Sequence, residues 1–586
     1  MKELSLASES VKHRSGFAGP TTRFRLRISM LDAMVFLALI PSLAIVGLLI
    51  VTVWTSVRES IIDFNLTFRH YIELYTDSFA LSAFFNTLGF SFSALVVAFL
   101  FGVPIAWIAE RSDVKGKAAI YTIMTLGVFI PSFFTAMGWL FLLHPRIGMA
   151  NVWLKNAFGL EAPLSIVNVP GMGFVQGLGL ASVVFVLTAA NLRITDARLE
   201  ESARMSGASF FTVMRRITLP LAWPGLLASG LYVFTIGIGA FDVPLVIGLT
   251  NRVYTFSSYL YVISSPISGL PNYGLVAAFA SFMMALALVL SWWYSRVLLK
   301  ARKYQIVSGK GFRGNMVQLG NWKYGAWAFV LIYFVISKLM PMLLMVWASF
   351  LPYFQAPSLK ALGNVSFINY ENIKWASLFR ALSNSVILMM TVPIISLTIS
   401  VIFSWVVLRS RSKYRLAFDF IAFLPHAVPH AVFAFAAVVF ALAIPPEWFD
   451  MYGSLSLLII VMSLAALSFG SRITNGALIQ IHPELEEAAY MSGASMLNVL
   501  RRIVFPLLKP AFLFGWLWIA LLTFRELTAP MILFSPENIT YSVAVWNLWF
   551  GGSLNQAAAV NVIMFALMLP MVILYWRYTG KVRIGD

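Results

Sequence analysis

Long apolar segments recur along the whole chain, separated by short polar stretches. Each is about 20 residues long, the length a helix needs to cross a hydrocarbon core of roughly 30 Å. Inside lipid every backbone group must be hydrogen-bonded within the chain, so such segments are expected to be helices. The pattern predicts about twelve membrane spans, near residues 31–57, 84–109, 118–143, 172–191, 224–242, 273–297, 325–349, 381–408, 416–442, 454–471, 511–533 and 557–577.

The composition agrees with this pattern. Hydrophobic residues make up 60% of the chain and charged residues 11%, and the mean hydropathy is +0.83. A soluble domain carries roughly a quarter charged residues. The predicted fold class is therefore an all-α membrane protein.

The net charge of +18 is placed mainly in the polar stretches on one side of the predicted spans. An even number of spans with a cytoplasmic N-terminus puts both termini on that side. Short cytoplasmic loops of membrane proteins are enriched in Lys and Arg. We therefore assign this charge to orientation in the lipid bilayer, with clusters such as Arg409 and Lys413 against anionic lipid, and expect no nucleic-acid partner.

Several kinds of site are missing from the sequence. There is no cysteine, which excludes disulfides and thiolate metal sites. There is no G-x4-G-K-(S/T) phosphate loop, so any ATP must be bound by another polypeptide. No constellation of His, acidic and nucleophilic residues indicates a catalytic or metal site. Residues 1–30 are expected to form a cytoplasmic tail, because the first apolar run is longer than the core of a signal peptide.

The chain divides into two similar halves. Gly, Lys and Arg interrupt the apolar pattern at 298–323, which predicts a cytoplasmic linker. The first half then covers 31–297 and the second 324–586, each with about six spans. Both halves have a basic loop after their second span, at 111–117 and 409–415. This organisation predicts parallel repeats related by an axis along the membrane normal.

One motif occurs in both halves, between the fourth and fifth predicted spans. Its form is E-x-A-x3-G-x9-I-x-(L/F)-P, and its copies at 201–220 and 487–506 are 286 residues apart. We call these segments the first and second motif loops. Their defining residues are Glu201, Ala203, Gly207, Ile217 and Pro220, then Glu487, Ala488, Ala489, Gly493, Ile503 and Pro506.

The spacing predicts two short helices in each motif loop. Gly207 is suited to the position just past the first helix, since Gly enters the left-handed region without a Cβ clash. Ser209 can cap the second helix, and Pro220 is expected to end it. The equivalent residues of the second loop are Gly493, Ser495 and Pro506. Two short helices at an angle would form a rigid projection.

The motif loops resemble the cytoplasmic "EAA" loop of permease subunits of binding-protein-dependent ABC importers. A chain with two such loops is most similar to the fused ferric-iron, thiamine and polyamine type. The resemblance implies two six-helix type I permease halves in a bacterial inner membrane, with both termini in the cytoplasm. It also implies a homodimer of ABC ATPase subunits docked on the loops, with ATP bound there and no cofactor on this chain. A solute-binding protein is expected on the outer, periplasmic or surface, side. Ser202 and Phe505 depart mildly from the family's pattern.

Two carboxylates inside the predicted spans are candidates for the transport pathway, because charges in lipid are costly and usually functional. Asp242 ends the fifth span and Glu526 lies in the eleventh, at similar distances from their motif glutamates. Carboxylates on opposite walls of a path would favour a cationic solute. The alternative is a structural ion pair with Lys338 of the seventh span.

Two histidines are further pathway candidates. His426 and His430 are spaced i, i+4, so they could share one face of a helix. Two histidines alone make a poor metal site, and none is predicted here. The prolines beside them predict a broken helix, which is common near transporter binding sites. The alternatives are contact with solute or gating on one hand, and a structural role on the other.

The predicted function is transport without enzymatic activity of its own. The cargo expected for the transmembrane subunit of such an ABC importer is ferric iron or another small solute, with a preference for cations. The alternative is a secondary transporter driven by an ion gradient. Such a transporter also has similar halves and intramembrane charges, but it has no use for two docking loops.

Overall fold

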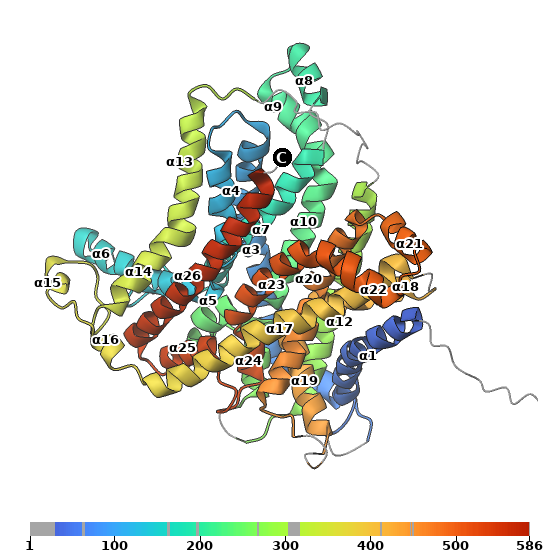
Figure 1. The fold of residues 1–586 in the computed structure, drawn as a ribbon. Helices are drawn as coiled ribbons and strands as arrows, with labels where there is room; N and C mark the ends of the chain where they lie inside the picture. The colour runs from blue at the N-terminus through green and yellow to red at the C-terminus, as the bar shows by residue number, and fades with distance from the viewer. Residues whose placement is uncertain are drawn as a thin grey trace, which may run out of the picture.

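The apolar segments are helices, and in the computed structural model they form one bundle (Figure 1). The structure describes residues 30–60, 65–160, 164–194, 198–266, 269–302, 317–410, 413–445, 447 and 450–584. Within these ranges ten helices are long and apolar enough to cross a membrane, or eleven if α18 and α19 count as one bent span. This confirms the all-α membrane fold. The predicted tail lies outside the described residues except for Met30.

The two halves share the order of their long helices and motif loops, and differ in the short helices between them. The first half comprises α1 (Met30–Ser56), α2 (Arg69–Thr76), α3 (Ser78–Arg111), α4 (Lys117–Leu126), α5 (Ser132–Leu143), α6 (Met149–Phe158), α7 (Val169–Ile194), α8 (Arg198–Met205), α9 (Phe210–Val213), η1 (Met214–Thr218), α10 (Leu219–Gly239), η2 (Pro244–Gly248), η3 (Leu249–Asn251), α11 (Phe256–Ser264) and α12 (Tyr273–Arg302). The second comprises α13 (Trp322–Phe334), η4 (Val335–Leu339), α14 (Met340–Ser349), α15 (Leu359–Leu362), α16 (Ile368–Glu371), α17 (Trp375–Arg409), α18 (Arg415–Ala427), α19 (His430–Ala443), α20 (Leu455–Gln480), α21 (Pro483–Met491), α22 (Met496–Val499), η5 (Leu500–Val504), α23 (Phe505–Phe524), α24 (Thr528–Ile532), α25 (Tyr541–Phe550) and α26 (Leu554–Ile584).

The first helix of each half packs against the other half. Helix α1 contacts α17, α18 and α19, whereas α14 contacts α5 and α26. Gly138 of α5 lies so close to α14 that an added Cβ would be 2.7 Å from the Pro341 carbonyl oxygen. The halves are therefore interlocked. The predicted linker at 298–323 stays a prediction, because residues 303–316 lie outside the described part of the chain.

Within the first half, α3 and α7 pack closely along their length. Small residues allow backbones in membranes to approach, and Gly177 is one of the contact points. A Cβ at Gly177 would lie 2.6 Å from the Ala94 carbonyl oxygen, whereas one at Gly179 would meet nothing within 4 Å.

This pair of glycines gives a matched stability test. Gly177→Ala should destabilise the folded protein by about 1–3 kcal/mol, the usual cost of overpacking. Gly179→Ala, on the same helix, should leave stability unchanged or slightly raised, since Ala is the better helix former. Thermal unfolding of both purified variants in detergent checks this. Equal melting temperatures for the two variants would contradict the packing seen between α3 and α7.

The predicted third and ninth spans are each broken rather than continuous. In the third, α4 ends at Leu126 and α5 begins at Ser132; in the ninth, α18 and α19 meet at a bend of 102°. Pro131 and Pro429 occupy the N-cap positions of α5 and α19. Proline lacks the N–H that would continue a helix, and it disfavours helical backbone in the preceding residue. Both breaks follow from the same residue type at equivalent positions.

The predicted fifth and eleventh spans also end earlier than expected. Helix α10 ends at Gly239 and α23 at Phe524. Asp242 lies just beyond α10, and Glu526 lies between α23 and α24. Both carboxylates are therefore carried by breaks in the helical structure, which places them where backbone and side chains can line a polar space.

Pro220 and Pro506 do not end their helices, contrary to expectation. The helical path is continuous over 210–239 and over 497–524. A π-helical turn precedes each proline: the Leu219 N–H bonds to the Met214 carbonyl and the Phe505 N–H to the Leu500 carbonyl. The wider turn makes the proline an early residue of the next α-helical segment, where its missing N–H is tolerated.

Candidate functional site

Each motif loop has the predicted helix–turn–helix form. Helix α8 is followed by Gly207 with φ +84°, and α21 is followed by Gly493 with φ +80°. The Ser209 hydroxyl accepts a hydrogen bond of 3.3 Å from the Thr212 N–H, and the Ser495 hydroxyl accepts one of 3.4 Å from the Asn498 N–H. The glycine turn and the serine cap are thus confirmed in both loops.

A buried arginine ties each motif loop to the long helices. Arg409, the last residue of α17, donates to Glu486 Oε1 at 2.9 Å and to the Ile481 carbonyl at 2.7 Å. Arg111, the last residue of α3, donates to the Leu192 carbonyl at 3.0 Å, and its Nε lies 3.6 Å from Glu200 Oε1. In both halves, therefore, the arginine that ends a long helix contacts a glutamate of the short helix, α8 or α21, and positions it.

Sequence reasoning missed these anchors. It assigned Arg409 to the lipid surface, which is wrong because the side chain is only 14% exposed and is paired with a glutamate that is 7% exposed. The motif glutamates Glu201 and Glu487 follow the anchored glutamates directly. The repeated Glu-Glu pair, together with the repeated arginine at the end of the second span, was the available signal.

The outer surface of each motif loop is apolar at its tip. Met205 is 90% exposed and Met491 is 89% exposed. Leu199 and Leu485 are also exposed beside them. In Figure 1, α8 lies at the upper edge of the molecule and α21 at the right edge. Exposed apolar side chains on projecting elements mark interaction surfaces.

The remaining motif residues lie at the base of this surface. Ala203 and Ala489 are half-buried, and Glu487 and Ala488 are exposed. Ile217 and Ile503 are half-buried, with Ile503 packed against a small cluster that includes Val499 and Leu508. Ile503 thereby packs the second π-helical turn, η5, against the bundle.

One unbroken helical path connects each motif loop with the middle of the molecule. The path 210–239 leads from the first loop to Asp242, and the path 497–524 leads from the second loop to Glu526. At 1.5 Å per residue each spans roughly 40 Å. A displacement of either loop would be transmitted along a stiff element to a carboxylate.

The four helix breaks meet at one place, which we call the central junction (127–131, 240–242, 428–430 and 525–527). The Arg525 guanidinium donates to the Ile130 carbonyl at 2.9 Å. On the other side, a Cβ added at Gly239 would lie 3.4 Å from Pro429 Cα. The end of the fifth span in each half thus contacts the broken helix of the opposite half.

Both predicted pathway carboxylates belong to the central junction. Glu526 Oε1 lies 3.9 Å from His430 Nδ1. Asp242 is within electrostatic reach of Glu526, Arg525 and His430, and close to the Ser132 hydroxyl. The structure therefore brings Asp242, Glu526 and His430 together. The alternative of an ion pair with Lys338 is not observed, since no described carboxylate lies within 4.0 Å of that amine.

His426 is separate from this group. It lies in α18, before the 102° bend, whereas His430 begins α19, so the two histidines do not share a helix face. The His426 ring stacks on Tyr232 with centroids 4.9 Å apart. Among the described residues, no group of three or more His, Asp and Glu side chains is placed to hold a metal ion.

The chain is similar to a known family and to several curated transport proteins. A family model described as "Binding-protein-dependent transport system inner membrane component" matches residues 102–303 and 396–582, once in each half. The chain is 24% identical over 506 residues, covering 85% of it and 71% of the relative, to a ferric transport system permease protein of Actinobacillus pleuropneumoniae. It is 21% identical to an Fe(3+)-transport system permease protein of Haemophilus influenzae, covering 79% of this chain and 83% of that one. It is also 26% identical to the molybdenum transport system permease protein of Escherichia coli, covering 36% of this chain and 92% of that one.

Proposed function

This chain belongs to the family of binding-protein-dependent transport system inner membrane components, and from that premise we propose the parts of its transport cycle. It is a multi-pass permease of the type I ABC importer class, with both halves on one polypeptide. We propose that two ABC ATPase subunits dock on the motif loops from the cytoplasm, where both termini also lie. A solute-binding protein delivers cargo on the opposite side.

The observation that carries ATPase docking is the pair of anchored, apolar-tipped motif loops. Each loop is held by a buried arginine, exposes a methionine at its tip, and continues into the helix that ends at the central junction. ATP-driven closure of the ATPase pair would draw the loops together and turn α10 and α23. Family membership leaves the ion-gradient-driven transporter without a supporting observation.

Purification of the tagged chain from native membranes tests this proposal. We expect an ATPase with a phosphate loop to co-purify, in a ratio of about two subunits per chain, which matches the two motif loops. The purified complex should hydrolyse ATP, and the solute-binding protein should stimulate it. A chain that purifies alone under mild detergents, with no ATP hydrolysis in the fraction, would overturn the proposal.

For the cargo we propose ferric iron or another small solute with cationic character. Two relatives that align with most of this chain are named for ferric or Fe(3+) transport. The carboxyl groups of Asp242 and Glu526 both lie at the central junction, where the halves meet. His430 beside Glu526 can contribute to solute contact or gating.

The double substitution Asp242→Asn and Glu526→Gln tests the carboxylates. It keeps side-chain size and removes both negative charges, so uptake of radiolabelled ferric iron in cells should fall by about tenfold or more, equivalent to roughly 1.4 kcal/mol. Association with the ATPase should be unchanged. The matched control is His426→Phe, which keeps the ring stack on Tyr232 and should transport normally. Wild-type uptake by the double variant would exclude the carboxylates from the pathway.

A further inference from the structure

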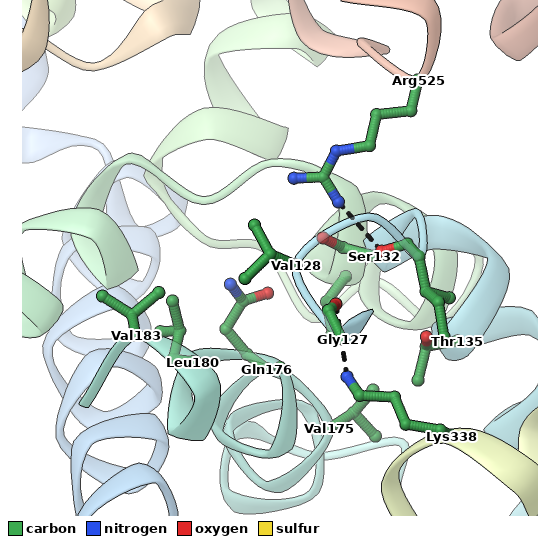
Figure 2. A pocket seen from close by; sticks show the side chains of 13 residues that line it. Gly127, Val128, Ser132, Thr135, Val175, Gln176, Leu180, Val183, Lys338 and Arg525 are labelled. Atoms are coloured by element: carbon green, nitrogen blue, oxygen red, sulfur yellow. Dashed lines mark hydrogen bonds between the residues drawn. The ribbon is translucent and has the colours of Figure 1, made fainter. Parts of the chain in front are cut away.

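A polar cavity of about 100 Å³ lies in the central junction beside the break between α4 and α5. Its polar side chains are Lys338, Arg525, Ser132, Thr135 and Gln176, and no carboxylate is among the described residues that line it. Figure 2 shows Lys338 and Arg525 approaching the break from opposite sides, with Ser132 and Gln176 between them. A water needs roughly 10–15 Å³ of such space. The cavity is therefore large enough for a small polyatomic ion.

Lys338 is a buried basic residue, and no carboxylate lies within 4.0 Å of its amine among the described residues. The residue is 7% exposed, and in the described part of the chain its amine forms one hydrogen bond, a long one of 3.4 Å to the Gly127 carbonyl. The charged side chain that shares its cavity is Arg525, which has the same sign. Burying an unpaired ammonium is costly. The charge of Lys338 would be compensated by an anion in the cavity.

Arg525 reaches the same space from the second half. One nitrogen, Nη1, donates to the Ile130 carbonyl at 2.9 Å. Asp242 and Glu526 attract the guanidinium, but neither forms an ion pair with it within 4.0 Å among the described residues. A guanidinium has five N–H donors in a fork that suits oxyanions. Its remaining donors can serve a ligand in the cavity.

The neutral lining adds further hydrogen-bonding groups. Ser132, Thr135 and Gln176 contribute two hydroxyls and an amide. Gly127 allows the lysine to approach, because a Cβ there would lie 2.4 Å from Lys338 Cε. On its other side, Lys338 borders an apolar pocket lined by Phe129, Phe565 and Met568. The Lys338 amine is therefore more stable facing the polar cavity than facing the apolar pocket.

Lys338 is not repeated in the other half of the pseudo-symmetric molecule. Lys338 precedes Pro341 by three residues in the first helix of the second half; the residue at the same distance before Pro41 is the fully buried Ala38. The break before α19 closes with a backbone hydrogen bond from the Val428 N–H to the Leu424 carbonyl. The equivalent helix break thus forms without a lysine. Lys338 is therefore not explained by a structural requirement common to both breaks.

We propose that this cavity binds a small oxyanion, such as phosphate or a carboxylate, between Lys338 and Arg525. The proposal rests on the transport function proposed above and adds a substrate class to it. The carboxylates lie close to these cations, since Ser132 borders both Asp242 and the cavity and Arg525 directly precedes Glu526. A cargo that carries both signs, for example a metal ion with a bound oxyanion, would meet carboxylates and cations within the same junction.

Calorimetric titration of the full-length chain in nanodiscs tests this, with inorganic phosphate and acetate as probes. Wild-type protein should bind at least one of them, and Lys338→Met should weaken binding by at least tenfold. Lys338→Arg should restore it, and Lys360→Met, at an exposed lysine of α15, should leave it unchanged. Gln176→Leu keeps both cations and should weaken binding less. It also provides a second variant if Lys338→Met does not fold.

Two results would overturn the oxyanion site. They are no binding of either probe by wild type, and equal binding by wild type and Lys338→Met. In the first case, a lower melting temperature of Lys338→Met would assign the lysine a structural role only. Nanodiscs with and without phosphatidylglycerol separate free anions from lipid phosphate. A lipid source would appear as competition by phosphatidylglycerol. Because binding is measured without ATPase subunits, its failure is distinguishable from failure of the transport proposal.

Discussion

Replacing Arg409 by glutamine is expected to release α21 from the bundle. The change leaves Glu486 buried without its partner, and removing one member of a buried ion pair costs about 3 kcal/mol or more. The pair is tight, at 2.9 Å, and both side chains are almost covered. Amide hydrogen exchange should therefore accelerate by about a hundredfold across 483–491, since each 1.4 kcal/mol is tenfold. The equivalent change at Arg111 should be smaller, because its Nε lies 3.6 Å from Glu200.

The double variant Arg409→Gln with Glu486→Gln is the matched control. It neutralises both Arg409 and Glu486, so no unpaired charge stays buried. The rate of amide hydrogen exchange in α21 should therefore return most of the way to the wild-type rate. Arg501→Gln, at an exposed position of η5, should have no effect. Slow exchange in α21 of Arg409→Gln would show that the arginine does not anchor the loop.

Replacing the exposed tips, with Met205→Glu and Met491→Glu together, should separate the permease from its ATPase subunits. Both side chains are about nine-tenths exposed, so the fold should be untouched. Burying two carboxylates in an apolar docking groove should cost at least 2 kcal/mol per site, as for a central interface residue. The amount of ATPase that co-purifies should fall by more than tenfold.

Leu359→Glu provides the control for this experiment. Leu359 is 89% exposed in α15, at the margin of the molecule away from α8 and α21 (Figure 1). The same charge placed there should leave ATPase co-purification unchanged. Equal loss from both variants would mean that added charge, and not the motif loops, is responsible.

Much of this architecture was predictable because the chain consists of two similar halves. The length of the apolar segments predicted the spans. The repeat of one motif with the same spacing in both halves predicted the motif loops, including the left-handed turns at Gly207 and Gly493 and the caps at Ser209 and Ser495. These features depend on local residue chemistry. Local chemistry does not change when the rest of the chain folds around it.

The features that were missed depend on partners far away in sequence. Arg409 looked like a lipid anchor until its partner Glu486 was placed beside it. His426 and His430 had the spacing of one helix face, but Pro429 separates them with a bend. Pro220 was expected to end a helix, and the preceding π-helical turn allows the helix to pass. The meeting of Arg525 with Ile130 requires the interlocked halves, which no local pattern encodes.

The central claim is that the motif loops are the docking sites of an ATPase, and cysteine cross-linking tests it most directly. The chain contains no cysteine, so Met205→Cys and Met491→Cys each introduce one unique thiol. A photoactivatable reagent on either thiol, used in native membranes, should capture the same polypeptide, identified by mass spectrometry as an ATPase with a phosphate loop. Leu359→Cys should not capture it. Absence of such an ATPase from both tip positions, or equal capture from Leu359→Cys, would contradict docking at the motif loops.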